Sequence, residues 1–169
     1  KKGKIVKKIS WITHHQYDIP LPKNHKFTSS KFSDLYKELK TKDFYRNAVI
    51  LSPNKASVHD LEIVHDREYI LKIKDGSLSE KENRRLGFKW SEILSNRSFL
   101  AVNGTLLTCK EALRNKIACH LAGGTHHAHE SFGSGYCVFN DIAYSSRKLI
   151  KENYVKKILI IDLDVHQGD

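Results

Sequence analysis

The carboxyl end of the chain reads Lys157-Ile-Leu-Ile-Ile-Asp-Leu-Asp-Val-His-Gln-Gly-Asp169, and an earlier stretch reads Ile117-Ala-Cys-His-Leu-Ala-Gly-Gly-Thr-His-His127. Each is a short apolar run followed by polar residues. Lys157 to Leu163 is rich in Ile and contains no Gly or Pro, which is typical of a strand buried on both faces of a sheet. Ile117 to Leu121 is a weaker candidate of the same kind.

A helix is expected between these two strands. Asp141 to Asn153 has helical spacing, with Ile142, Leu149 and Ile150 as candidates for the packed side. Asn140, or the first residue of the helix, can cap its start. Strand, helix and strand in this order predict a right-handed crossover and a parallel sheet. The polar residues that follow both strands should then meet at the carboxyl edge, where open α/β sheets place their ligand sites.

The polar residues after the second strand have the spacing of metal ligands. Asp162, Asp164 and His166 share one face of an extended segment, and Leu163 and Val165 face the other way. A carboxylate and a neutral imidazole on one side suit zinc. Asp162, one step deeper, could instead accept a hydrogen bond from a neighbouring histidine and fix its tautomer. The alternative is a strand that ends in a polar turn, with acids that merely cap backbone groups; the Gly-Gly-Thr-His-His turn beside it favours a site.

Three motifs together resemble the zinc-dependent histone deacetylase superfamily, which includes bacterial acetoin-utilisation and acetylpolyamine amidohydrolase relatives. They are Gly123-Gly-Thr-His-His-Ala128, Gly135-Tyr-Cys-Val-Phe-Asn-Asp141 and Asp162-Leu-Asp-Val-His-Gln-Gly-Asp169. The segments 17–22, 64–70 and 84–91 resemble the class IV branch. The resemblance implies an α/β fold of three αβα layers around a mostly parallel sheet, incomplete here at its carboxyl terminus.

The resemblance also implies a reaction, which is the zinc-dependent removal of acyl groups from lysine side chains or related amides such as acetylpolyamines. It assigns the metal to Asp164 and His166. A structural monovalent cation, K⁺, would contact the Asp162 side chain and the backbone carbonyls of Asp164 and His166.

The remaining implied roles belong to proton transfer and substrate binding. His126 pairs with Asp162, and His127 pairs with Asp169, as catalytic groups. Gly135 and Tyr136 would line the tunnel for the acyl-lysine stem.

The family carries a third zinc ligand, another Asp, and a transition-state Tyr further along the chain than residue 169. Residues 1–169 are therefore expected to be the amino-terminal part of a single deacetylase domain, weakly active or inactive alone. Two alternatives stay open. One is an arginase-like hydrolase with a manganese pair, although such enzymes usually carry Gly-Gly-Asp-His and Asp-x-His-x-Asp patterns. The other is a non-catalytic remnant that binds acyl-lysine.

The composition limits the domain size, the partners and the cellular compartment that are expected. The 169 residues suffice for one domain with a real core. The 29 Lys and Arg exceed the 19 Asp and Glu, giving +10, which favours acidic partners. Lys is spread throughout and no basic run is interleaved with aromatics, so nucleic acid is not an expected partner. Three cysteines without paired metal spacing indicate reduced thiols and a cytoplasmic protein. No apolar stretch is long enough for a membrane span, and the oligomeric state is not fixed.

The rest of the chain predicts further elements and few further functional groups. His14, His15 and His25 are interpreted as loop residues, and His65 as a buried structural histidine. Gly104, inside a helix, indicates close packing against a neighbour. The predicted strands are 9–12 and 48–51, and the predicted helices are 31–39, 58–64, 68–74 and 99–113.

Overall fold

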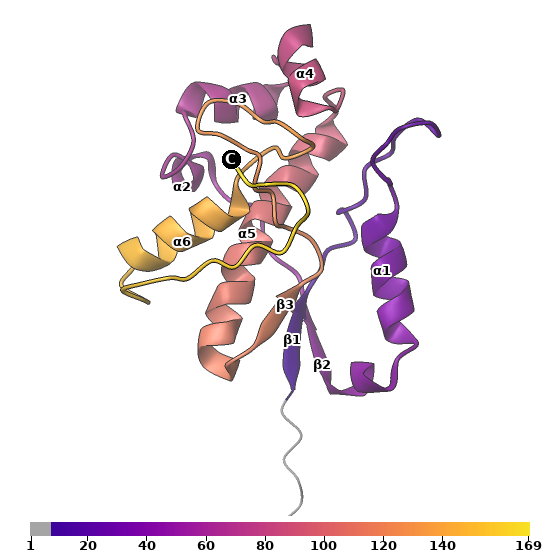
Figure 1. Cartoon of the computed structure of the whole chain (residues 1–169), viewed down its shortest axis with the longest axis vertical. Helices are drawn as coiled ribbons and strands as arrows, with labels where there is room; N and C mark the ends of the chain where they lie inside the picture. Colours follow the sequence, from indigo (N-terminus) through magenta and orange to yellow (C-terminus); the bar gives the residue numbers. More distant parts are fainter. Residues whose placement is uncertain (1–7) are drawn as a thin grey trace, which may run out of the picture.

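The computed structural model describes residues 8–169 and shows helices packed around a small sheet (Figure 1). The elements in chain order are β1 (Ile9–Ile12), α1 (Lys31–Lys40), the 3₁₀ turn η1 (Asp43–Asn47), β2 (Ala48–Leu51), α2 (Val58–Leu61), α3 (Arg67–Asp75), α4 (Glu80–Leu86), α5 (Glu92–Asn115), β3 (Ala118–His120) and α6 (Asp141–Lys151).

The three strands form a parallel sheet in the order β2-β1-β3. The central strand, β1, is the most deeply buried, and Ile12 is fully enclosed. The sheet continues for one residue beyond β3, because the Leu121 amide donates to the Ile12 carbonyl at 2.9 Å. The chain therefore leaves β3 at the carboxyl edge, where the glycine- and histidine-rich loop begins.

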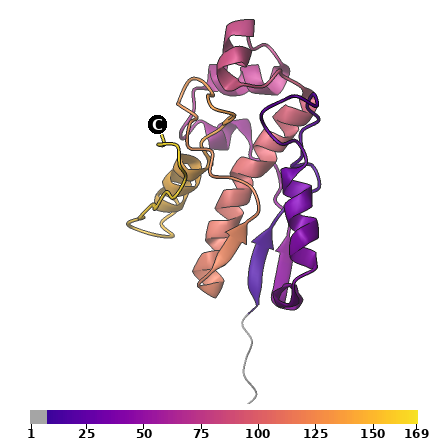
Figure 2. The ribbon, with the colours of Figure 1, turned by 45° about the vertical axis from the view of Figure 1, so that its right-hand side comes forward.

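Helices cover both sides of this sheet. Helix α1 lies on one side and the long helix α5 on the other, and α6 packs against the outer side of α5 (Figures 1 and 2). Tyr17 and Phe32 join α1 to α5 in a small apolar cluster. A larger cluster joins α2, α3 and α6 to α5. The predicted α/β fold, with a parallel sheet between helical layers, is confirmed.

Local sequence signals account for most helix ends. Ser57 and Asn140 accept backbone N–H groups at the starts of α2 and α6, and Asn140 is one of the two caps that the sequence predicts for α6. Gly76 ends α3 in the left-handed conformation. Helix α4 is short and starts with a capping box at Ser79. Helix α5 begins seven residues before the predicted Phe99, because Ser91 caps it at 92.

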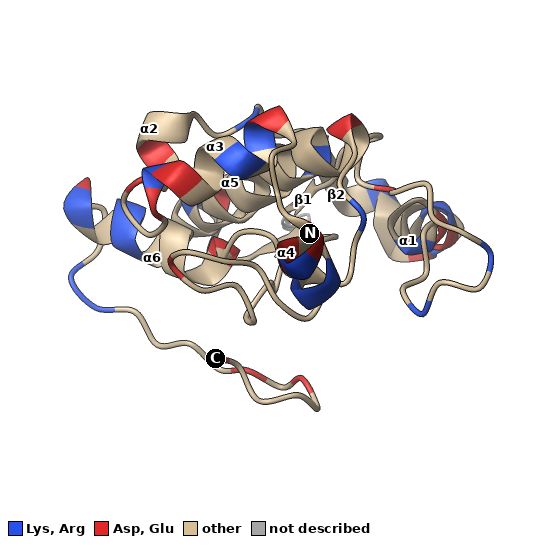
Figure 3. Cartoon of the chain, turned by 90° about the horizontal axis from the view of Figure 1, so that it is seen from above, with Lys and Arg blue, Asp and Glu red and all other residues tan. Residues whose placement is uncertain are grey.

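One strand prediction is wrong. The structure leaves residues 157–163 without regular secondary structure, and Leu159 and Ile161 are 83% and 72% exposed. A parallel strand forms only where ladder partners and covering helices exist, and none of the described residues donates or accepts a ladder bond there. Leu163 and Val165, expected on the face opposite Asp162, Asp164 and His166, are each 91% exposed. Figure 3 shows the segment running outside the body.

The packed face of α6 also differs in part from its prediction. Leu149 is buried as expected, but Ile150 is 44% exposed, and Tyr144 fills the interface with α5. At about 100° per residue, the buried side chains of α6 span one side of the helix, from Tyr144 to Leu149, and Ile150 lies on nearly the opposite side. Among the described residues, no helix combines the length and apolar character needed to cross a membrane.

Candidate active site

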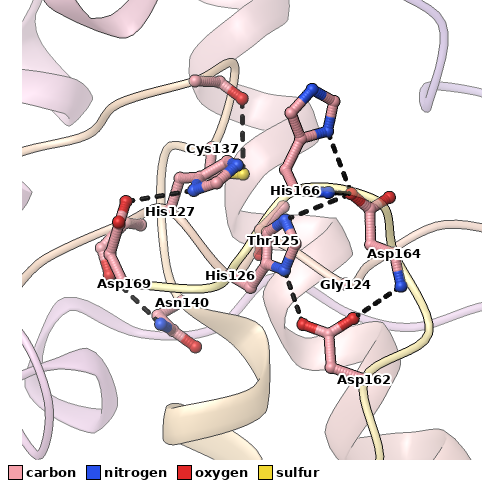
Figure 4. A network of polar contacts seen from close by, with 12 residues as sticks. Gly124, Thr125, His126, His127, Cys137, Asn140, Asp162, Asp164, His166 and Asp169 are labelled. Carbon is pink, nitrogen blue, oxygen red and sulfur yellow. Dashed lines mark hydrogen bonds and ion pairs between the residues drawn. The ribbon is translucent and has the colours of Figure 1, made fainter.

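Two segments meet beyond the carboxyl ends of the strands. The loop from Ala122 to Phe139 leaves β3, and the tail after α6 returns across it (Figure 4). One backbone hydrogen bond ties the segments together, from the Asp169 amide to the His126 carbonyl at 3.0 Å. The predicted site residues therefore come together although the tail forms no strand.

His126 faces two carboxylates of the tail. Its Nδ1 lies 2.7 Å from Asp162 Oδ2, and its Nε2 lies 3.9 Å from Asp164 Oδ2. The hydrogen bond from His126, followed by that from the Asp164 amide, lowers the pKa of the Asp162 carboxyl. An ionised Asp162 accepts a hydrogen bond from the Nδ1–H of His126. The lone pair of His126 Nε2 is then free on the cleft side.

His127 repeats this arrangement with a second carboxylate. Its Nδ1 lies 3.0 Å from Asp169 Oδ2, and the same oxygen lies 3.6 Å from His129 Nε2. The rings of His126 and His127 have centroids 4.2 Å apart, and the ring of His166 lies 6.0 Å from that of His127. Three imidazoles thus lie close together, and each has a carboxylate oxygen beside its Nδ1.

Asp164 and His166 form a donor pair of the kind that zinc accepts. Asp164 Oδ2 lies 3.0 Å from His166 Nδ1 and 2.8 Å from the His166 amide. The hydrogen bond from that amide, and then the one from the ring, lower the pKa of the Asp164 carboxyl. Asp162 and Asp164 both also cap the backbone two residues on, so the turn described by the alternative interpretation is present as well.

The Asp164 oxygen and the His166 nitrogen are ligand types that suit zinc, but they are fewer than a catalytic zinc site requires. The oxygen and nitrogen of Asp164 and His166 are adjacent and open to the cleft. Within residues 8–169, no group of three His, Cys, Asp or Glu side chains is close enough to hold a metal ion. The described residues therefore offer two of the three protein ligands usual at a catalytic zinc.

The cleft has a volume of about 330 Å³, and Gly135 and Tyr136 lie in its wall. Gly135 has φ +50°, and a Cβ there would lie 2.7 Å from the His127 ring. A side chain at 135 would therefore push His127 out of place. Tyr136 has φ +66°, held by a hydrogen bond from its amide to the Leu86 carbonyl at 2.9 Å.

Comparison with known proteins agrees with this geometry. The model of the histone deacetylase domain matches residues 25–169. The chain belongs to the histone deacetylase family. An uncharacterized protein of Picosynechococcus is 39% identical over 158 residues, which are 94% of this chain and 53% of that protein. The acetoin utilization protein AcuC of Staphylococcus aureus is 34% identical over 145 residues, 76% of this chain and 37% of AcuC.

The fold is likewise shared with a solved structure. The crystal structure of the HDA15 HD domain superposes with a TM-score of 0.77, covering 97% of this chain and 49% of that chain at 16% identity. The chain thus spans about half, or less, of the length of these three proteins.

Sequence reasoning missed part of this deacetylase-family cleft. Lys31 and Arg97 line it, and Arg97 is only 4% exposed. The Arg97 Nε–H donates to the Tyr17 carbonyl at 3.3 Å. Burial, and then the nearby Arg97 guanidinium, lower the pKa of Lys31. The sequence signal for Arg97 is a charged residue at one of the otherwise apolar positions of α5.

The other histidines lie outside the cleft lining. His65 accepts the Asn140 amide at 3.0 Å and is 3% exposed, in line with a structural role. His25 joins its loop to the Gly87 carbonyl at 3.0 Å and stacks on Phe88.

Proposed function

We propose that this chain contributes the proton-transfer groups and two metal ligands of a zinc-dependent deacetylase that removes acetyl groups from lysine side chains or related amides. It would form the amino-terminal part of a single deacetylase domain in the cytoplasm. The observation that carries the proposal is the pair of carboxylate-bonded histidines in one cleft, facing the Asp164–His166 donor pair. Family membership supports the same reaction class.

The two histidines have complementary tasks in amide hydrolysis. With Nδ1 of His126 bonded to Asp162, its Nε2 can accept the proton of an attacking water. His127, bonded to Asp169, can hold a proton and deliver it to the departing amine. Each carboxylate fixes one tautomer and stabilises the imidazolium that forms during transfer. The assignment of base and acid within the pair can be exchanged without changing the chemistry.

Asp164 and His166 would hold the zinc. When bound, zinc would polarise the amide carbonyl and acidify a water. The Asp162 side chain, with the carbonyls of Asp164 and His166, would serve the structural potassium ion. Gly135 and Tyr136 would flank the acyl-lysine stem, because Tyr136 forms an aromatic wall of the cleft.

The test is hydrolysis of an acetyl-lysine peptide and of an acetylpolyamine with added zinc. It compares the 169-residue chain with the product of the complete reading frame that contains it. The complete product should hydrolyse at least one substrate and be inhibited by a hydroxamate chelator. The 169-residue chain should be far slower, since loss of one oxyanion donor alone costs about 10²–10³ in turnover.

The same assay separates the rival functions. Activity that depends on manganese would favour an arginase-like metal pair. Retention of the acetyl-lysine peptide without hydrolysis by the complete product would favour a binding protein. Either result would overturn the proposal.

A further inference from the structure

Behind the histidine pair, four polar side chains from separate elements form one continuous chain of hydrogen bonds. The Tyr17 hydroxyl lies 2.8 Å from His120 Nε2, and His120 Nδ1 lies 2.8 Å from Thr105 Oγ1. Thr105 Oγ1 lies 2.5 Å from Asp141 Oδ2. Tyr17 and Asp141 are 0% and 1% exposed. None of these four groups takes part in the proton transfers proposed above.

The direction of every proton in this chain can be deduced. An ionised Asp141 can only accept, so the single hydroxyl proton of Thr105 points to it. Thr105 Oγ1 must then accept from the Nδ1–H of His120. The other nitrogen, Nε2, is left to accept the Tyr17 hydroxyl. His120 is therefore neutral in one tautomer, and burial lowers its pKa to about 4, which agrees with a neutral ring.

The Asp141 end of this chain of hydrogen bonds reaches the turn that leads into His126 and His127. Asp141 accepts the backbone N–H of Gly124 at 3.0 Å and that of Thr125 at 2.7 Å. It also contacts the Thr125 hydroxyl at 2.5 Å. Gly124 and Thr125 directly precede His126 and His127. One buried carboxylate thus fixes the two peptide units that lead into the catalytic pair.

Close packing leaves these hydrogen-bonded side chains little room to rearrange. A Cβ on Gly104 would lie 2.5 Å from both His120 Nε2 and the Tyr17 hydroxyl. A Cβ on Gly123 would lie 2.6 Å from Asp141 Oδ2. Side chains that cannot move aside hold their hydrogen-bond partners in a narrow range of positions.

We infer that His120, Thr105 and Asp141 are positioning residues: together they hold the Gly124–Thr125 backbone and so orient His126 and His127 toward the cleft. The inference deepens the proposed function and rests on it for the role of the histidine pair. The geometry it describes can be measured without turnover, so the two can fail separately.

The test compares two threonines on the same helix. Thr105→Val removes the hydroxyl that links His120 to Asp141. Thr108→Val is the matched control, because Thr108 is also half-buried and, within residues 8–169, its hydroxyl bonds only the Gly104 carbonyl of its own helix, at 2.8 Å. Amide hydrogen exchange, followed by NMR, should become about tenfold or more faster at Gly124 and Thr125 in Thr105→Val. It should stay at the wild-type rate there in Thr108→Val.

A second readout excludes a general loss of stability. The ring Nδ1–H of His126, observed in ¹⁵N-histidine-labelled protein, reports its bond to Asp162. This signal should shift or vanish in Thr105→Val and persist in Thr105→Ser, which keeps the hydroxyl. Amides in the middle of α5 should keep their wild-type exchange. Equal acceleration across α5 and the turn, or an unchanged His126 signal, would overturn the inference.

If Thr105→Val does not fold, Tyr17→Phe provides the same test from the other end. Removal of the Tyr17 hydroxyl leaves His120 Nε2 without its donor and frees the ring to turn. Exchange at Gly124 and Thr125 should rise a few-fold in this variant. Wild-type exchange at both amides in folded Tyr17→Phe would show that the hydrogen-bond chain does not position the turn.

Discussion

The buried His120 should make the stability of the chain depend on pH in a defined window. Its pKa falls from 6.5 to about 4 on folding, mainly because burial disfavours the charged ring. Between these values the unfolded chain binds a proton that the folded chain does not, so folding stability falls as pH decreases through 6.5 toward 4. Each pH unit crossed corresponds to about 1.4 kcal/mol per proton. Between pH 7 and pH 5 we expect His120 to remove about 2 kcal/mol from the free energy of unfolding.

The assay is urea unfolding followed by circular dichroism at pH 7, 6 and 5, for the wild type and His120→Asn. His14 and His65 also have lowered pKa values from burial, but they are present in both proteins and cancel in the comparison. The variant should be less stable at pH 7 and should lose about 2 kcal/mol less between pH 7 and pH 5. Parallel losses in the two proteins would refute the conclusion that His120 is neutral and buried in the folded state.

Three further variants test the packing around Gly104, the cap of α4 and the exposed apolar side chains of the tail. Gly104→Ala should destabilise the chain by about 2 kcal/mol in urea unfolding, because its Cβ would press on two fixed polar groups; a change below about 0.5 kcal/mol would contradict the tight packing. Ser79→Ala should cost about 1 kcal/mol by the same measurement, since it removes the capping box of α4, and an unchanged midpoint would show that the cap is dispensable. Because Leu159 and Ile161 are exposed apolar side chains, we expect the 169-residue chain to self-associate in analytical ultracentrifugation. Leu159→Lys combined with Ile161→Lys should reduce this association, and unchanged association would place the contact elsewhere.

Two of the predicted strands form where the sequence places them and pair with each other. Segments 9–12 and 48–51 are short and mostly apolar, each with two β-branched residues, and the two pair as parallel strands. Lys157–Leu163 carries the same local signal but remains unpaired. A strand is a property of two neighbouring segments, and the apolar pattern of one segment does not specify its partner.

The site shows the same division between local and tertiary information. The spacing of Asp162, Asp164 and His166 is local, and the structure places these side chains beside the histidine turn. Asp141 was interpreted only as a possible helix cap, yet Asn140 caps the helix and Asp141 reaches the turn 16 residues earlier. Such a role depends on the path of the whole loop and could not be predicted from neighbouring residues.

The most direct test of the proposed zinc site is metal retention in matched histidine variants. Purified product of the complete reading frame, loaded with zinc and dialysed, would be analysed for metal by mass spectrometry and for deacetylase turnover. His166→Ala should lose zinc and turnover together, because it removes a ligand. His127→Ala should keep about one zinc per chain and lose turnover, because it removes a proton-transfer group. Equal zinc retention by the two variants would contradict the assignment of His166 to the metal and of His127 to proton transfer.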